Sequence, residues 1–185
     1  MSLTAATLIT GVLLIALGLL FLLRSPVVET SLKRFPRSRS MAYIFFGLGA
    51  VWFLFRVWHL SEADFGQYRK QLTIFFALVA VGSFIFVPDF LAVRGVCVMV
   101  LLGAANLLDP GYMVWDYGQL TDFGGIYLYK IAVFAAVALA IYFGASPFRA
   151  RDFLNWLYQR TARSVWLGGA LIAYGLAVSA VAFTY

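Results

Sequence analysis

The chain has 185 residues, of which 63% are hydrophobic, 18% aromatic and 12% charged, and its mean hydropathy is +0.90. A soluble domain is roughly 45–50% apolar and about 25% charged, so this chain carries too little polar surface to be a soluble globule. Its apolar residues gather in long runs between short charged stretches. This pattern excludes a disordered chain, a coiled coil and a disulfide scaffold. It predicts an all-α fold, a polytopic integral membrane helical bundle.

Six apolar runs are long enough to cross a bilayer as helices. In chain order they cover residues 3–23, 41–58, 72–87, 92–108, 126–144 and 164–183. The first run lacks the basic start and the small-residue cleavage site of a signal peptide, so we expect it to be retained as a helix. We expect residues 1–185 to form a single transmembrane domain.

The third and fourth runs form one apolar stretch, 72–108, that is interrupted only by Pro88-Asp89 and Arg94. A single helix of that length would be about 55 Å long, nearly twice the hydrocarbon thickness. Because proline cannot continue helical hydrogen bonding, the sequence predicts a turn at 87–92 and two short helices in a hairpin. A re-entrant hairpin would return to the same side of the membrane and leave the other spans unchanged.

Positive charge predicts the orientation of these spans. Residues 24–39 hold five lysines and arginines, 149–163 hold four and 109–125 hold none, so with Arg94 one side carries ten of the fourteen. Loops rich in lysine and arginine face the cytoplasm. We therefore expect a multi-pass protein of the inner (plasma) membrane with both termini on the outer side. The same bias explains the net charge of +6, so we expect no nucleic-acid partner.

Both basic loops contain a helix-start signal, Ser25-Pro26 in the first and Ser146-Pro147 in the second. Serine at the N-cap followed by proline at the first helical position favours a helix at that point, so we expect a short interfacial helix in each loop. In the second loop, residues at the spacing i, i+3, i+4, i+7 predict a helix lying in the headgroup region; they are Phe153, Trp156, Leu157 and Arg160. That helix is interpreted as a plain membrane anchor or as a dock for lipid or a partner.

Small residues recur at every fourth position in the last two spans. The fifth span has Ala132, Ala136, Ala140 and Gly144, and the sixth has Gly169, Ala173 and Ala177. Small residues at this spacing let helix backbones approach closely in a membrane. We expect these two stripes to pack against each other, and the aromatic second span to face lipid or another chain.

One group of polar residues is predicted to gather on the outer side. Its members stand at or beyond the outer ends of the spans: Arg56, His59, Asn106, Asp109, Asp116 and Lys130. The segment 109–112 is expected to form a type II turn. The structural interpretation pairs Arg56 or Lys130 with an aspartate, with Asp109 as the best candidate. An enzyme would place its carboxylates and cations in such a layer, but their spacing resembles no catalytic template.

Few residues are candidates for chemistry or for holding a cofactor. His59 is the single histidine and Cys97 the single cysteine, so neither a bis-histidine haem nor a cysteine metal cluster can form within the chain. Ligation of a haem or pigment by His59 stays an alternative to a surface or ion-paired histidine. No common catalytic or phosphate-loop motif occurs. We expect no cofactor, and whether the chain is an enzyme stays open, with the residues favouring that it is not.

These observations predict a non-enzymatic integral membrane protein, an accessory or scaffolding subunit of a larger membrane complex. Its expected partners are membrane lipids and other membrane protein chains, as a hetero- or homo-oligomer. The alternative is a small transporter or oligomeric channel for a neutral or lipid-like solute. An internal cavity lined by Ser83, Asn106 and Tyr174 would favour transport, whereas a solid core with aromatic outer faces would favour the subunit.

Overall fold

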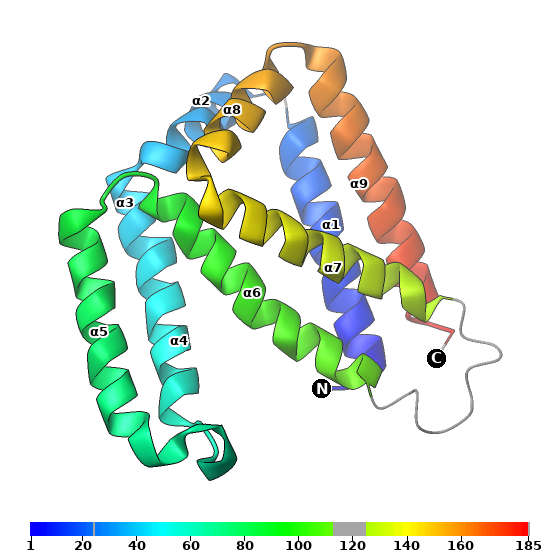
Figure 1. The fold of residues 1–185 in the computed structure, drawn as a ribbon. Helices are drawn as coiled ribbons and strands as arrows, with labels where there is room; N and C mark the ends of the chain where they lie inside the picture. The colour runs from blue at the N-terminus through cyan, green and yellow to red at the C-terminus, as the bar shows by residue number, and fades with distance from the viewer. Residues whose placement is uncertain (24, 113–124, 185) are drawn as a thin grey trace. The chain divides into compact units, whose positions relative to one another are not determined.

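The computed structural model describes residues 1–23, 25–112 and 125–184 (Figure 1). Within these ranges the regular structure is helical and no β-strand occurs. The α-helices are α1 (Leu3–Leu22), α2 (Pro26–Arg34), α3 (Arg39–Met41), α4 (Gly47–Trp58), α5 (Arg69–Phe86), α6 (Leu91–Tyr112), α7 (Ile126–Ala145), α8 (Pro147–Tyr158) and α9 (Thr161–Val181). Three short 3-10 turns, η1 (Phe35–Arg37), η3 (Glu62–Asp64) and η4 (Gly66–Tyr68), and one π-helical turn, η2 (Ala42–Phe46), complete them.

Over the described residues, the structure confirms an all-α fold with six helices long and apolar enough to cross a membrane. They cover Leu3–Leu22, Arg39–Trp58, Gly66–Phe86, Leu91–Tyr112, Ile126–Ala145 and Thr161–Val181, and each overlaps one of the predicted runs. The stretch 72–108 is divided between α5, with 18 residues, and α6, with 22 residues. At 1.5 Å per residue these helices are about 27 and about 33 Å long, enough for two full spans.

The short helices of the two basic loops begin where the sequence predicts them. α2 starts at Pro26 and α8 at Pro147, each directly after a serine. The predicted type II turn at 109–112 is wrong, because α6 continues through Pro110 to Tyr112. Proline removes a backbone donor and crowds the carbonyl four residues before it, but only two residues of α6 follow Pro110, so little of the helix is affected.

The chain divides into two compact units. Unit 1 comprises the described residues of Met1–Lys33, Gly103–Leu139 and Asp152–Tyr185, and unit 2 comprises Arg34–Leu102 and Ala140–Arg151. Each unit has its own buried apolar clusters. The expectation of a single transmembrane domain stays a prediction.

Unit 1 is built on a close antiparallel pair, α1 and α9. A Cβ on Gly18 would lie 2.7 Å from the Gly168 carbonyl oxygen, and a Cβ on Gly175 would lie 2.8 Å from the Gly11 carbonyl oxygen. The two helix backbones therefore touch at glycines two turns apart, the geometry that small residues allow in membrane helices. Because Gly11 faces Gly175 and Gly18 faces Gly168, the two chain termini lie at the same end of this pair.

The helix pairing differs from the one expected from the small-residue stripes. Gly169 has no atom within 4 Å of its Cβ position, and Ala173 and Ala177 are exposed. The face of α9 that packs against α1 begins one residue earlier, at Gly168. In unit 2, Ala140 packs with Cys97 of α6, and the Cβ position of Gly144 lies 3.6 Å from the Cys97 Cβ.

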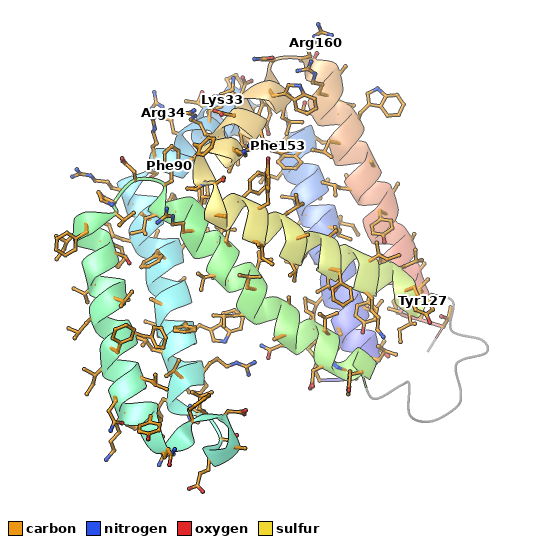
Figure 2. The ribbon with its side chains drawn as sticks, viewed as in Figure 1. Lys33, Arg34, Phe90, Tyr127, Phe153 and Arg160 are labelled. Carbon is orange, nitrogen blue, oxygen red and sulfur yellow. The ribbon has the colours of Figure 1, made fainter. Side chains whose placement is uncertain are left out.

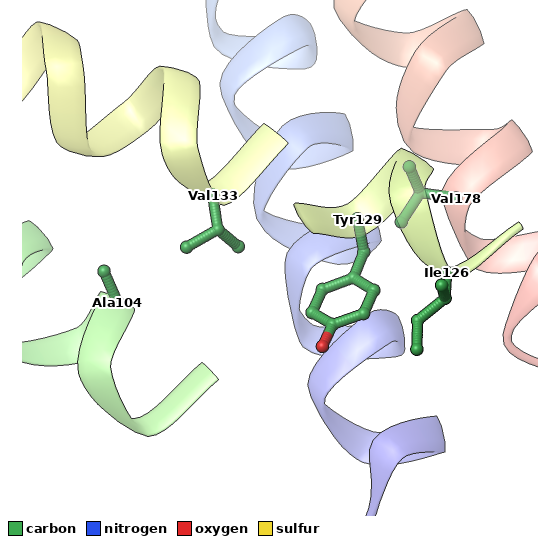
Figure 3. Packing of buried hydrophobic residues seen from close by; sticks show 5 residues of the cluster. All are labelled: Ala104, Ile126, Tyr129, Val133 and Val178. Atoms are coloured by element: carbon green, nitrogen blue, oxygen red, sulfur yellow. The ribbon is translucent and has the colours of Figure 1, made fainter. Parts of the chain in front are cut away.

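The largest buried cluster of unit 1 lies where α7 and α9 meet the last turns of α6. Figure 3 shows its five members, Ala104, Ile126, Tyr129, Val133 and Val178. Beside it, the Tyr174 hydroxyl of α9 donates a hydrogen bond of 2.8 Å to the Leu128 carbonyl oxygen of α7. Unit 1 is thus held by backbone contact, apolar packing and a polar tie between helices.

In unit 2, aromatic side chains hold α5 in place. Phe84 of α5 stacks on Tyr43 with ring centroids 5.1 Å apart and meets Phe46 edge-on at 5.2 Å. Phe53 of α4 and Phe76 of α5 form a further edge-to-face pair at 5.0 Å. Such pairs contribute about 0.5–1.5 kcal/mol each beyond their buried area, so they fasten α5 to α4 and to the π-helical turn.

Candidate functional site: arginines around Phe90

The predicted outer polar cluster falls in both units, so each part is described within its own unit. In unit 2, Arg56 and His59 are exposed near the end of α4. The Nδ1 atom of His59 lies 2.8 Å from the Phe55 carbonyl oxygen, and its ring contacts the Phe55 ring at 4.2 Å. His59 therefore caps its own helix. Asp116 lies outside the described residues.

In unit 1, Asn106 and Asp109 are exposed on the last turns of α6. The expected ion pair between Lys130 and Asp109 is not formed in the described part of the chain. Lys130 Nζ instead donates a hydrogen bond of 3.0 Å to the Gly111 carbonyl oxygen. A helix leaves its last carbonyls without internal donors and carries partial negative charge there, so a lysine is stabilised at this position without a carboxylate.

The residues proposed for the interfacial helix lie on and just after α8. Leu157 is fully buried, whereas Trp156 is 48% exposed. Phe153 stacks on Trp156 at 6.1 Å, and Arg160 is exposed just before α9. Arg163 Nη1 donates to the Trp156 carbonyl oxygen at 2.9 Å, so the end of α8 is tied to the start of α9.

The α5–α6 turn of unit 2 has an unusual backbone, as does Phe65 in the turn before α5. Phe90 has a φ of 59°, a left-handed conformation that is a true outlier for a bulky residue. Its carbonyl oxygen accepts hydrogen bonds from the amides of Val93 at 3.1 Å and Arg94 at 3.2 Å, and these bonds open α6. Figure 2 labels Phe90 at this turn.

Two arginines from separate loops lie over the Phe90 ring. The guanidinium carbon of Arg37, in η1, is 5.5 Å from the ring centroid, and that of Arg151, in α8, is 5.9 Å from it. Both distances are within the range of cation–π attraction. The Phe90 ring therefore brings together the first basic loop, the second basic loop and the α5–α6 turn.

A third arginine stands one helical turn after Phe90. Arg94 is half-buried, and its Nε atom is fully buried without a hydrogen-bond acceptor in the described chain. Side chains on a helix point toward its N-terminus, so the Arg94 side chain leans back toward the Phe90 end of α6. A buried guanidinium donor without an acceptor costs free energy. The Arg94 Nε–H group could therefore donate a hydrogen bond to an anion.

Close packing of α6 fixes the arginines in place. Gly95, the next residue after Arg94, lies so close to the backbone of Phe45 and Phe46 that a Cβ would clash with it. Phe35 packs both on the cluster of Leu91 and Ala92 and on the cluster that contains Ala150. The backbones that carry Arg37, Arg94 and Arg151 are each next to one of these contacts.

Part of this site could be predicted from the sequence. Positive charge predicts that both basic loops and the turn with Arg94 lie on one side of the membrane. It does not predict that Arg37 and Arg151 meet on one aromatic ring, because that contact depends on how η1 and α8 pack. A phenylalanine in a short polar turn between two spans, flanked by basic loops, is the signal that was available.

The guanidinium groups of this site are chemically suited to oxyanions. Guanidinium groups donate several hydrogen bonds in a fixed plane and keep their charge at every physiological pH. Metal binding has no comparable support, since the described residues contain no group of three histidine, cysteine, aspartate or glutamate side chains that could hold an ion.

No protein-family model matches this chain, and no curated protein or solved structure matches it either.

Proposed function

We propose that this chain is a non-enzymatic integral membrane protein that acts as an accessory or scaffolding subunit of a larger membrane complex. It would reside in an inner (plasma) membrane, with the two basic loops in the cytoplasm and both termini outside. Its partners would be membrane lipids and other membrane protein chains. The observation that carries the proposal is the uncovered face of α5.

No residue of α5 is buried, although the helix is long and apolar enough to span a bilayer. Four aliphatic side chains form a row along it, each 61–68% exposed: Ile74, Leu78, Val81 and Ile85. Their spacing alternates between four and three residues, the a/d seam of a coiled coil. Such a seam inserts side chains as knobs into holes of a facing helix, so it supports a partner helix along α5.

The aromatic contacts of α5 explain why this row faces away from unit 2. Phe76 and Phe84 hold the helix to α4 and to the π-helical turn. The remaining side of α5 then presents aliphatic groups with little side-chain entropy to lose on binding. Close packing rather than a hydrophobic drive holds helices together in lipid, and this regular row is suited to it.

The polar groups named for a transport path are already engaged or exposed. The Ser83 hydroxyl donates to the Val79 carbonyl oxygen of its own helix at 2.8 Å, and the Tyr174 hydroxyl donates to Leu128. Asn106 is exposed. These contacts favour the subunit over the transporter or channel.

Photocrosslinking in native membranes tests the proposal. A photoreactive amino acid replaces Leu78 in the α5 row, and a control variant carries it at Leu13, an exposed leucine of α1. We expect discrete protein adducts from position 78, lost when Ile74, Val81 and Ile85 are changed to alanine. Adducts to lipid alone at position 78 would overturn the proposal. Adducts only to a second copy of the chain would favour the oligomeric channel instead.

Thiol labelling tests the orientation separately. Cysteine replaces Ser38 in the first basic loop or Ser2 near the N-terminus, and an impermeant reagent is applied to intact spheroplasts. We expect labelling at position 2 and none at position 38, because the positive loops stay inside. The reverse pattern would refute the proposed orientation.

A further inference from the structure

We propose that Arg37 and Arg94, on either side of the Phe90 turn, bind the phosphate of an anionic phospholipid. The ligand chemistry is a phosphate diester carried at the membrane surface. The inference rests on the part of the proposed function that places the chain in a bilayer. It goes beyond that function because it assigns a lipid class and a defined site.

The first support is an excess of positive charge at this end of unit 2. Five arginines of the unit come from η1, its flanking residues, the start of α6 and the start of α8: Arg34, Arg37, Arg39, Arg94 and Arg149. One carboxylate, Asp89, stands in the same turn. Asp89, Arg37 and Arg94 form no ion pair with one another or with another described residue. A bound phosphate would neutralise charge that the chain itself leaves uncompensated.

The second support is that some of these arginines have hydrogen-bond partners within the chain and others do not. Arg149 stacks on the rings of Tyr142 and Phe148 and donates to the Tyr142 hydroxyl. Arg37 and Arg94 make no side-chain hydrogen bond with a described residue, and Arg94 Nε is buried. Desolvating a guanidinium donor is costly unless an oxygen accepts from it. A phosphate oxygen would supply the acceptor that Arg94 lacks.

The third support is the backbone of Phe90. Its left-handed conformation costs on the order of 1–2 kcal/mol in a residue with a side chain. Strain of this kind persists where surrounding contacts fix it, and it gathers at ligand sites. Here it places the ring under two guanidinium groups. Contact with the ring face leaves the edge N–H groups of Arg37 available for a phosphate.

A lipid fits this site better than a soluble phosphate or an acidic protein segment. Phe90 lies four residues after the end of α5, and the residues just before the turn are apolar and exposed: Ile85 at 68%, Phe86 at 82% and Val87 at 40%. A headgroup held by the arginines would therefore have its acyl chains against this apolar end of a spanning helix. Neither a free phosphate nor an acidic segment would use that surface.

Native mass spectrometry of the purified full chain tests the site. The chain is released from nanodiscs that contain phosphatidylcholine with phosphatidylglycerol, and the retained lipids are counted. We expect phosphatidylglycerol to be retained in preference to phosphatidylcholine. Arg37→Gln with Arg94→Gln should weaken its apparent affinity at least about tenfold, the effect of losing one charge-assisted hydrogen bond.

Matched variants separate this site from general charge. Arg160→Gln removes one positive charge from an exposed position of unit 1, as Arg94→Gln does at the site, and should retain the lipid normally. Arg94→Lys keeps the charge but loses the planar donor group, and it should bind about as weakly as Arg94→Gln. Phe90→Gly tolerates the left-handed backbone and removes the ring, so it should stay folded by circular dichroism and still lose lipid.

Several results would overturn the inference. Equal retention of the two lipids, or equal losses in Arg160→Gln and the double variant, would show that no specific site exists. Displacement by soluble glycerol phosphate at matched concentration would refute a lipid ligand, and displacement only by acidic peptides would point to a protein partner. Retained phosphatidylglycerol with lipid-only crosslinks at Leu78 would overturn the subunit proposal while supporting this site. Extraction of the chain from membranes by alkaline carbonate would show that it is not embedded in a bilayer, which the subunit proposal and the lipid site both require.

Discussion

The α1–α9 pair of unit 1 and the α4–α5 hairpin of unit 2 represent two ways to join membrane helices. In the first, glycines bring the backbones into contact, with Gly18 against Gly168 and Gly11 against Gly175. In the second, aromatic side chains such as Phe84 and Phe53 bridge the helices. The glycine pair buries residues of both helices, whereas no residue of α5 is buried.

This difference separates a helix pair that is packed closely on itself from a helix with an uncovered face. Packing between small residues supplies the van der Waals contact that holds membrane helices together. A helix held on one side by a few rings leaves its other side for lipid or another chain. We therefore expect substitutions in unit 1 to lower the protein's own stability, and substitutions on the outer face of α5 to change what binds it.

The largest effect is expected at adjacent glycines of α9. A Cβ on Gly168 would lie 2.8 Å from the Gly18 carbonyl oxygen, while a Cβ on Gly169 would meet nothing within 4 Å. Gly168→Ala should lower the free energy of unfolding in detergent by about 1–3 kcal/mol through overpacking. Gly169→Ala should leave it unchanged or raise it by up to about 1 kcal/mol, because alanine favours helix.

Denaturant titration followed by circular dichroism measures the unfolding free energy of both variants, which carry the same glycine-to-alanine change at neighbouring positions of α9. Equal losses in the two variants would mean that α9 does not use the Gly168 face against α1. A larger loss at Gly169 would restore the pairing through Gly169, Ala173 and Ala177 that the sequence pattern suggests.

These neighbouring glycines also show where the sequence stops being informative. Six apolar runs fix the six long helices, and Ser-Pro pairs mark the starts of α2 and α8. A spanning helix that is apolar on every side has no amphipathic pattern to show which of its faces packs against another helix. Small residues at both Gly168 and Gly169 therefore allowed two stripes, and the actual one was decided by α1.

The same limit applies to the polar residues. The basic loops predict which segments share a side, but only packing through Phe35 and Gly95 brings η1, α6 and α8 together at Phe90. Pro110 marked the end of α6 about one turn too early, because a proline near a helix end interrupts little of it.

The next effect tests whether unit 1 also depends on fixed polar contacts. Lys130 Nζ donates to the Gly111 carbonyl oxygen at 3.0 Å, and Asp109 is exposed. Lys130→Met keeps the aliphatic stem and should cost about 1 kcal/mol, the net contribution of such a hydrogen bond. Asp109→Asn should change the unfolding free energy by less than about 0.5 kcal/mol.

Thermal unfolding of both variants in the same detergent gives the comparison. A cost at Asp109 equal to that at Lys130 would revive the ion pair between them. No cost at either residue would show that this end of unit 1 is fixed by apolar contacts alone.

The smallest effect concerns Tyr158, the last residue of α8, in unit 1. Its hydroxyl is buried and has no hydrogen-bond partner in the described chain, so Tyr158→Phe should leave stability at pH 7 unchanged or raise it by up to about 1 kcal/mol.

Burial, and then the negative charge of Glu29, raise the pKa of the Tyr158 hydroxyl above its usual value. The folded state therefore favours the protonated phenol. This contribution is present below the unfolded pKa of about 10 and is lost as the pH rises through the raised folded pKa. Chemical denaturation of the two proteins between pH 8 and pH 11, values that bracket that pKa of about 10, should show the wild type losing more stability than Tyr158→Phe at the alkaline end. Parallel losses would mean that Tyr158 ionises as freely in the folded chain as in the unfolded one, and that the end of α8 is as open as the outer face of α5.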